Sequence, residues 1–273
     1  MTVAKLLIGI IIALAIVAAC SAPQPAPSGS APATLTVFAA ASLAQACAEL
    51  GGRFEAQHPG VEVVFNFAGS QQLAQQLAQG APGDVFASAD AAQMSVAIER
   101  GRVRSGAPRD FARNRLVVVY PKDNPAGLVD LRDLARPELR GRLVLAAAAV
   151  PAGEYTLAFL DKASADPRFG ARFKDAVLSN AGSYEENVRA ALSKVVLGEA
   201  FAGIVYESDV AGEAANEVGR IQIPDALNVL ATYPIAPIAD SARPDLAQAF
   251  VDFVLSPEGQ DVLAKHGFLR ASD

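Results

Sequence analysis

The stretch TLTVFAAASLAQACAEL, residues 34–50, joins two kinds of hydrophobic pattern in one short segment. Its first half, TLTVFA, is rich in β-branched and aromatic residues and predicts a strand over 34–39. From Leu43 onward, apolar residues recur at the three- and four-residue spacing of a helix that continues to Phe54. Ser42 stands at the junction, where a hydroxyl can cap the free N–H groups that begin a helix. A strand that runs directly into a capped helix is typical of an α/β protein.

The same alternation continues through the rest of the chain, and Ser70 marks a second junction of this kind after VEVVFNF. Strand, helix, strand at this spacing predicts parallel sheets with helices on both faces, the doubly wound α/β class. Six such strands in 273 residues fit two lobes joined by crossing strands, with a ligand in the interlobe cleft. The predicted strands are 34–39, 61–67, 84–88, 116–120, 142–147 and 201–206, and further helices are predicted near 90–101, 154–163, 186–198, 244–255 and 257–265.

Residues 1–20 have the pattern of a lipoprotein signal peptide. Lys5 precedes an uncharged run that is short for a bilayer span but suits a signal-peptide core. The run ends in Val-Ala-Ala before Cys20, which resembles the bacterial lipobox, where the cysteine carries lipid. Residues 21–33, SAPQPAPSGSAPA, predict an extended tether. We therefore expect an extracytoplasmic protein held at a membrane by lipid on Cys20, with plain secretion and a retained anchor as the alternatives.

Charge, cysteine content and histidine content exclude or disfavour several classes. The formal net charge is −6 and no Lys/Arg block occurs, so the electrostatic footprint of a nucleic-acid-binding protein is missing. With Cys20 carrying lipid, Cys47 has no disulfide partner and is expected to be a small buried hydrophobic residue. His58 and His266 are expected on the surface. Because the chain has no nucleophile elbow, zinc-protease motif or P-loop, a secreted hydrolase is the less favoured class.

Six short motifs resemble one family, in order and at similar spacing. They are FAAASL (38–43), FAGSQQLAQQL (67–77), GAPGDVFASAD (80–90), VPAGEYT (150–156), ENVRAAL (186–192) and AGIVYESDV (202–210). With them, the chain from about residue 34 to 270 resembles the periplasmic molybdate-binding proteins of ABC transporters. The resemblance implies the type II periplasmic-binding fold, with lobe I at 34–114 and 233–273 and lobe II at 115–232. It also implies a monomer that captures molybdate, and tungstate, without a cofactor and delivers it to an ABC permease in the membrane.

The resemblance also assigns a ligand-binding set in which three residues offer hydroxyls and three offer backbone N–H groups. These positions are Ser42, Ser70 and Tyr206 for the hydroxyls, and Ala89, Ala152 and Val188 for the backbone. Without the resemblance, the serines would be ordinary helix caps, the tyrosine a half-buried core aromatic, and the other three helix-start or core residues. The motif series favours the ligand-binding interpretation.

None of the six assigned positions is charged, so dipoles and hydrogen bonds would hold a bound anion. A fully ionised tetrahedral oxyanion needs only donors, whereas a phosphate that bears a proton also needs an acceptor. This favours molybdate, tungstate or sulfate over phosphate. Receptors for sulfate, thiosulfate, ferric ion or a small organic acid on the same architecture are the alternatives. Ferric sites usually show tyrosine pairs and carboxylates, which the assigned set lacks.

Three residues within the motifs, but outside the assigned ligand-binding set, carry separate expectations. Gly69 stands where serine is expected to be common in the family, and the glycine is expected to loosen its loop or to remove a secondary hydroxyl. Glu154 is expected to point to solvent, because a carboxylate that faces a dianion would be repulsive. Asp90 is expected to cap a helix.

Overall fold

The computed structural model describes residues 33–271, apart from the side chains of residues 213 and 214. The predicted signal peptide, Cys20 and all but the last residue of the predicted tether lie outside the described residues. Of the helices within 33–271, none combines the length and the apolar character that crossing a membrane requires.

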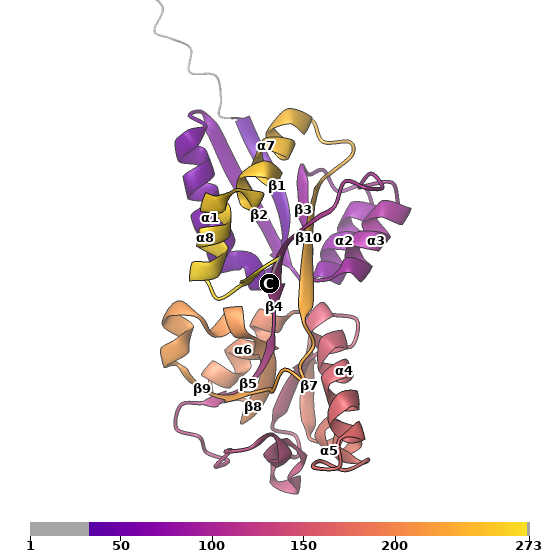
Figure 1. Cartoon of the computed structure of the whole chain (residues 1–273), viewed down its shortest axis with the longest axis vertical. Coiled ribbons are helices and arrows are strands. Elements are labelled where there is room, and N and C mark those ends of the chain that lie inside the picture. The colour runs from indigo at the N-terminus through magenta and orange to yellow at the C-terminus, as the bar shows by residue number, and fades with distance from the viewer. Residues whose placement is uncertain (1–32, 272–273) are drawn as a thin grey trace, which may run out of the picture. The chain divides into compact units, whose positions relative to one another are not determined.

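The first of two lobes is built on a six-stranded sheet in the order β11-β4-β10-β3-β1-β2 (Figure 1). Strand β1 pairs in parallel with β2 and β3, whereas β10 runs antiparallel to both β3 and β4. The strands are β1 (Ala33–Ala40), β2 (Val61–Ala68), β3 (Val85–Ala87), β4 (Arg109–Asn114), β10 (Ala231–Pro237) and β11 (Leu269–Arg270). The helices are α1 (Ala44–Gln57), α2 (Ser70–Ala78), α3 (Ala91–Glu99), α7 (Pro244–Leu255) and α8 (Pro257–Lys265).

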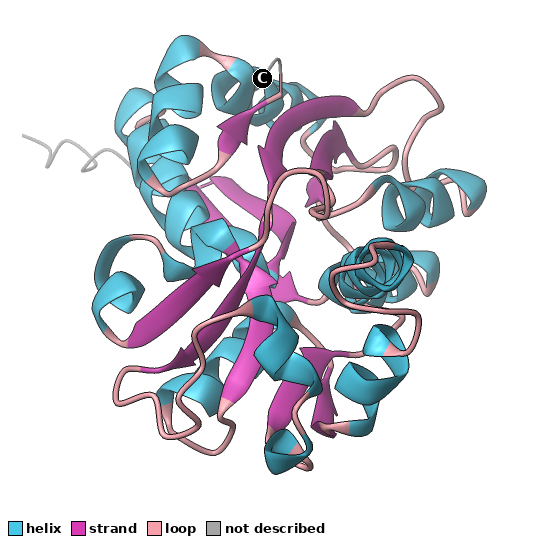
Figure 2. Ribbon diagram, turned by 60° about the horizontal axis from the view of Figure 1, so that its bottom comes forward, coloured by secondary structure: helices cyan, strands magenta, loops and turns pink. Residues whose placement is uncertain are grey.

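The second lobe is built on a five-stranded sheet in the order β7-β6-β8-β5-β9. Strand β6 is parallel to β7 and β8, and β5 is antiparallel to β8 and β9. The strands are β5 (Leu116–Pro121), β6 (Leu143–Ala146), β7 (Ala181–Glu185), β8 (Ala202–Tyr206) and β9 (Val218–Gln222), and the helices are α4 (Pro151–Ala165), α5 (Phe173–Ser179) and α6 (Val188–Val196). Short 3-10 helices are η1 (Ala41–Leu43), η2 (Leu131–Ala135), η3 (Pro137–Leu139), η4 (Glu207–Val210) and η5 (Gly212–Asn216). Figure 2 shows helices around the strands of both lobes.

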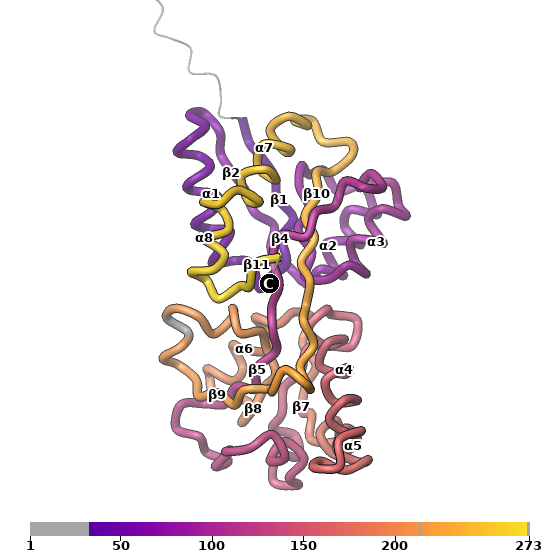
Figure 3. Tube along the Cα trace, in the orientation of Figure 1, coloured from indigo at the N-terminus to yellow at the C-terminus, as the bar shows by residue number. Residues whose placement is uncertain are grey.

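The two lobes are linked by strands that cross between them (Figure 3). Strand β4 of the first sheet ends at Asn114 and β5 of the second begins at Leu116, so a single residue separates them. The chain returns through β10, and just before it the Asn228 side chain accepts from the Leu116 N–H (3.0 Å) and donates to the Leu116 carbonyl (2.9 Å). The outgoing and returning segments are therefore fastened side by side at the crossing.

The helix predicted after the first strand forms as α1, and its apolar face is buried. Cys47, Leu50 and Phe54 are all buried, and Phe54 packs edge-on against Phe250 of α7, with ring centroids 5.2 Å apart. Burial raises the pKa of the Cys47 thiol to about 12, so the thiol stays neutral. The prediction that Cys47 is a small buried hydrophobic residue is confirmed.

All six predicted strands are present, but the expectation of parallel sheets was wrong. Both sheets are mixed and not parallel, because β5, β9 and β10 belong to the paths that leave and re-enter a lobe and run against their neighbours. The two histidines, which were expected on the surface, are partly exposed. His58 stacks on Phe54, with ring centroids 4.0 Å apart, and His266 Nε2 lies 2.9 Å from Glu49 Oε2.

Candidate functional site

Ser42 is buried in the 3-10 turn η1, directly after β1. The expectation that it caps a helix was wrong: the residue before η1 is Ala40, the residue before α1 is Leu43, and neither helix start has a side-chain cap. Ser42 lies in the middle of the short turn that precedes α1, so its hydroxyl is not at a capping position. Its Oγ lies 3.0 Å from the hydroxyl of Tyr233 on β10.

Ser70 is the first residue of α2 and is also buried. Gly69 occupies the cap position before it, so the expected capping role of Ser70 was wrong as well. The Ser70 Oγ accepts a hydrogen bond of 2.9 Å from the backbone N–H of Ala89, which follows β3. This bond joins the start of α2 to the start of α3.

In the second lobe, α4 and α6 begin at neighbouring points. Pro151 is the first residue of α4, where its lack of an N–H does no harm, and Ala152 follows it, buried. Val188 is the first residue of α6, and Asn187 caps this helix by accepting from the Ala190 N–H at 2.9 Å. Helix α4 follows the buried strand β6, and α6 follows β7, whose residues are partly or fully exposed.

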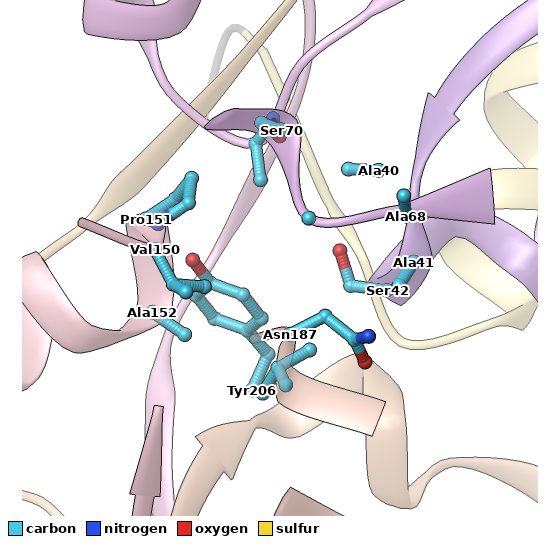
Figure 4. A pocket seen from close by; sticks show the side chains of 13 residues that line it. Ala40, Ala41, Ser42, Ala68, Ser70, Val150, Pro151, Ala152, Asn187 and Tyr206 are labelled. Carbon is cyan, nitrogen blue, oxygen red and sulfur yellow. Dashed lines mark hydrogen bonds between the residues drawn. The ribbon is translucent and has the colours of Figure 1, made fainter. Parts of the chain in front are cut away.

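These four segments and the end of β8 surround one small pocket, which Figure 4 shows from close by. Its cavity volume of about 10 Å³ is far below the roughly 300–1,000 Å³ typical of drug-sized ligands. All six residues that the sequence assigned to a ligand are among its lining residues. The lining is Ala40, Ala41, Ser42, Ala68, Gly69, Ser70, Ala89, Val150, Pro151, Ala152, Asn187, Val188 and Tyr206.

The pocket has no charged side chain, but the positive ends of helix dipoles face it. No residue of the lining is Lys, Arg, His, Asp or Glu. The first turns of α2, α4 and α6 each leave N–H groups without intrahelical acceptors, and the positive ends of their dipoles face the same space. Such converging helix N-termini attract an anion and repel a cation.

Tyr206 contributes the one aromatic ring of the lining, at the end of β8. The side chain is buried, and among the described residues its hydroxyl has no hydrogen-bond partner. Burial raises the pKa of this hydroxyl well above its usual range, so it keeps its proton. A buried hydroxyl without a hydrogen-bond partner is unfavourable unless a ligand supplies the acceptor.

Two acidic residues near the pocket lie as predicted. Asp90 caps α3, where its Oδ1 accepts from the Gln93 N–H at 2.8 Å. Burial raises the pKa of this carboxyl. Glu154 is exposed on α4, although it lies only two residues after Ala152. Neither carboxylate is part of the pocket lining.

Gly69 does not loosen its loop, because its missing side chain permits a close approach between lobes; the alternative, that it removes a secondary hydroxyl, stays a prediction. A Cβ at this position would lie 2.4 Å from the backbone oxygen of Glu186 in the second lobe. Glu186 also accepts from Gln71 Nε2 at its backbone oxygen (2.8 Å) and from Gln72 Nε2 at its carboxylate (2.9 Å). These contacts draw the rim of the pocket together, which contradicts a loosened loop.

Sequence reasoning missed the rest of the lining and one polar neighbour. The small residues Ala40, Ala41 and Ala68 give no chemical signal, and their role is to leave room. Asn187 carried the usual signal of a helix cap, an Asn before an apolar helical run. Tyr233 was missed because its strand was not predicted.

The model of the bacterial extracellular solute-binding protein family matches residues 35–269. The molybdate-binding protein ModA of Mycobacterium tuberculosis (strain ATCC 25618 / H37Rv) is 39% identical over 239 residues, which are 87% of this chain and 85% of that protein. YvgL of Bacillus subtilis (strain 168), a putative ABC transporter substrate-binding lipoprotein, is 28% identical over 266 residues. These residues are 97% of this chain and 97% of that protein.

Two solved structures share the architecture. The Azotobacter vinelandii periplasmic molybdate-binding protein superposes with a TM-score of 0.74 at 22% identity, over 86% of this chain and 98% of that one. The sulfate-binding protein SubI of Mycobacterium tuberculosis H37Rv superposes with a TM-score of 0.78 at 20% identity, over 88% and 87%. At these identities the likeness establishes the two-lobed α/β fold of periplasmic binding proteins.

Proposed function

The chain belongs to the bacterial extracellular solute-binding protein family, and we propose that it captures molybdate outside the cytoplasmic membrane and delivers it to an ABC importer. The observation that carries the proposal is the pocket itself, which is small, lies between two lobes, has no charged side chain and faces several helix N-termini. This arrangement suits a compact anion that is fully ionised at neutral pH. The relative with 39% identity is a molybdate-binding protein, which supports molybdate among such anions.

The six predicted residues take the following roles in this proposal. Ser42, Ser70 and Tyr206 donate their hydroxyl protons to the oxyanion, and Ala152 and Val188 donate backbone N–H groups from the first turns of α4 and α6. Each such bond to a charged ligand contributes about 1.5–3 kcal/mol. The Ala89 N–H is already donated to Ser70 Oγ, so it supports the site through Ser70, and its direct bond to the ligand stays a prediction.

Tungstate belongs to the proposed ligands because it has the same charge and tetrahedral geometry as molybdate. Sulfate is the alternative, since it also needs only donors and differs mainly in size. A ferric ion fits the pocket poorly, because the lining holds one tyrosine and no carboxylate. A catalytic role is not proposed, because the relatives are solute-binding proteins.

We further propose that the protein works as a monomer on a lipid anchor. The lipobox-like sequence before Cys20 and the similarity to a putative lipoprotein over 97% of both chains support the signal peptide at 1–20, the tether at 21–33 and lipid on Cys20. Residues 34–114 with 233–273, and residues 115–232, would then move as two lobes. An ABC permease would recognise their closure over the ligand.

Thermal unfolding of the full chain in mild detergent tests the proposed ligand. Molybdate at a hundred times its dissociation constant adds about 2.7 kcal/mol, which for a domain of this size raises Tm by roughly 5–10 °C. We expect this rise with molybdate and tungstate, and not with phosphate at equal ionic strength. The double variant Ser42→Ala/Ser70→Ala should lose the rise, while the exposed-site control Ser179→Ala should keep it. A larger rise with sulfate would replace molybdate with sulfate as the ligand, and no rise with any anion would refute the proposal.

A further inference from the structure

Tyr233 lies behind the pocket and contacts two of its lining residues, Ser42 through its hydroxyl and Tyr206 through its ring. The residue is on β10, one of the strands by which the chain crosses between lobes, and it is completely buried. Its ring packs edge-on against Phe111, Tyr206 and Phe268, with centroids 5.4–6.3 Å away. It is not a lining residue of the pocket, but its hydroxyl lies 3.0 Å from Ser42 Oγ.

The distance between the Ser42 and Tyr233 hydroxyls does not show which of them donates. The hydrogen bonds of Asn114 identify the donor. The Asn114 Oδ1 accepts from the Arg115 N–H at 3.0 Å, which fixes the orientation of the amide. Its Nδ2 therefore faces the other way and donates to Ser208 Oγ (2.7 Å) and to the Tyr233 hydroxyl (3.3 Å). An amide nitrogen can only donate, so the Tyr233 oxygen is an acceptor in that bond.

The single proton of the Tyr233 hydroxyl then has Ser42 Oγ as its acceptor. Among the described residues, no other acceptor is hydrogen-bonded to this hydroxyl. Burial raises the pKa of Tyr233 well above its usual range, so the proton stays in place. The hydrogen bonds thus run in one direction: Asn114 donates to Tyr233, and Tyr233 donates to Ser42.

We propose that Tyr233 is a positioning residue for anion binding: by donating to Ser42 Oγ, it leaves the Ser42 proton free for the bound oxyanion. The inference rests on the proposed function of the pocket. Ser70, also in the first lobe, has the same arrangement. Its Oγ accepts a hydrogen bond from the Ala89 N–H, so its own proton points elsewhere. Both serines accept from within the protein and donate to the ligand. A pocket of such oriented donors favours a fully ionised oxyanion over one that bears a proton.

A double-mutant cycle separates this role from simple packing. The four proteins are the full-length wild type, Tyr233→Phe, Ser42→Ala and the double variant, each titrated with sodium molybdate in a calorimeter. The Phe variant keeps the ring and its edge-on contacts and removes only the hydroxyl. We expect Tyr233→Phe to raise Kd about three- to tenfold, the loss of about one neutral hydrogen bond. In the Ser42→Ala background the same change should alter Kd less than twofold, because the residue through which Tyr233 acts is gone.

Tyr120→Phe is the matched control, because Tyr120 is a half-buried tyrosine on β5 outside the pocket lining, and its Kd should equal that of the wild type. If the losses of Tyr233→Phe and Ser42→Ala multiply, Tyr233 acts through packing and the inference is overturned. An unchanged Kd in Tyr233→Phe overturns it as well. A wild type that does not bind molybdate at all overturns the proposed function together with the inference, whereas the other two outcomes leave the proposed function standing.

Discussion

Replacing Tyr206 with phenylalanine should change affinity and stability in opposite directions. The hydroxyl is buried and has no partner among the described residues, so its removal breaks no hydrogen bond of the ligand-free protein. A buried unsatisfied hydroxyl costs about 1–3 kcal/mol, and deleting it should raise the ligand-free Tm by at least about 2–4 °C in a protein of this size. The phenylalanine ring keeps its edge-on contacts with Tyr155 and Tyr233.

The same substitution removes a donor to the bound anion. One hydrogen bond to a charged ligand is worth about 1.5–3 kcal/mol, so Kd for molybdate should rise about tenfold to more than a hundredfold. Titration calorimetry measures Kd, and a thermal scan without ligand measures Tm. The control is Tyr155→Phe, whose ring also packs edge-on against Tyr206 but which lies outside the lining. The control should keep its Kd. A Tyr206→Phe protein that is less stable and binds molybdate normally would refute this reasoning.

Two further substitutions test the close contact at Gly69 on the pocket rim and the buried carboxyl of Asp209. Gly69→Ala should raise Kd for molybdate about fivefold to a hundredfold, because the new Cβ would lie 2.4 Å from Glu186 O and overpacking of this kind costs about 1–3 kcal/mol. Gly52→Ala on α1, whose Cβ meets nothing within 4 Å, is the control in the same calorimetric titration and should leave Kd unchanged. Burial raises the pKa of Asp209 from 3.8 to about 7, so the folded state binds this proton more tightly than the unfolded state does. The resulting stabilisation is present below pH 4 and is lost as pH rises through about 7. Thermal scans from pH 4 to 8 should therefore show the Tm of wild type falling relative to that of Asp209→Asn, and parallel curves would contradict the pKa shift.

The fold could be predicted where local pattern and final environment agree. The strands 34–39 and 116–120 are rich in β-branched residues and mostly buried, and the helix after Leu43 has one apolar face, so each was visible from the sequence. Strand β10 was not predicted, because Pro234 and Pro237 argue against a strand. The ladder tolerates them through an irregularity in register beside Pro234. Strand β4, RDFARN, is too polar to stand out.

The candidate site could be predicted only through the series of motifs. Ala89, Ala152 and Val188 carry no chemistry in their side chains, and what places them at the pocket is the point where each helix begins. The capping role of Ser42 was wrong because a 3-10 turn, which local sequence does not distinguish from the first turn of an α-helix, precedes α1. Its actual partner, Tyr233, is 191 residues away in the sequence, and no local pattern could join the two.

A crystal structure of the protein with molybdate, recorded with anomalous diffraction at the molybdenum edge, tests the central claim most directly. We expect one strong anomalous peak in the pocket between the lobes, within hydrogen-bond distance of the hydroxyls of Ser42, Ser70 and Tyr206 and of the N–H groups that begin α4 and α6. A peak outside this pocket, or molybdate held by carboxylates or lysines, would contradict the account.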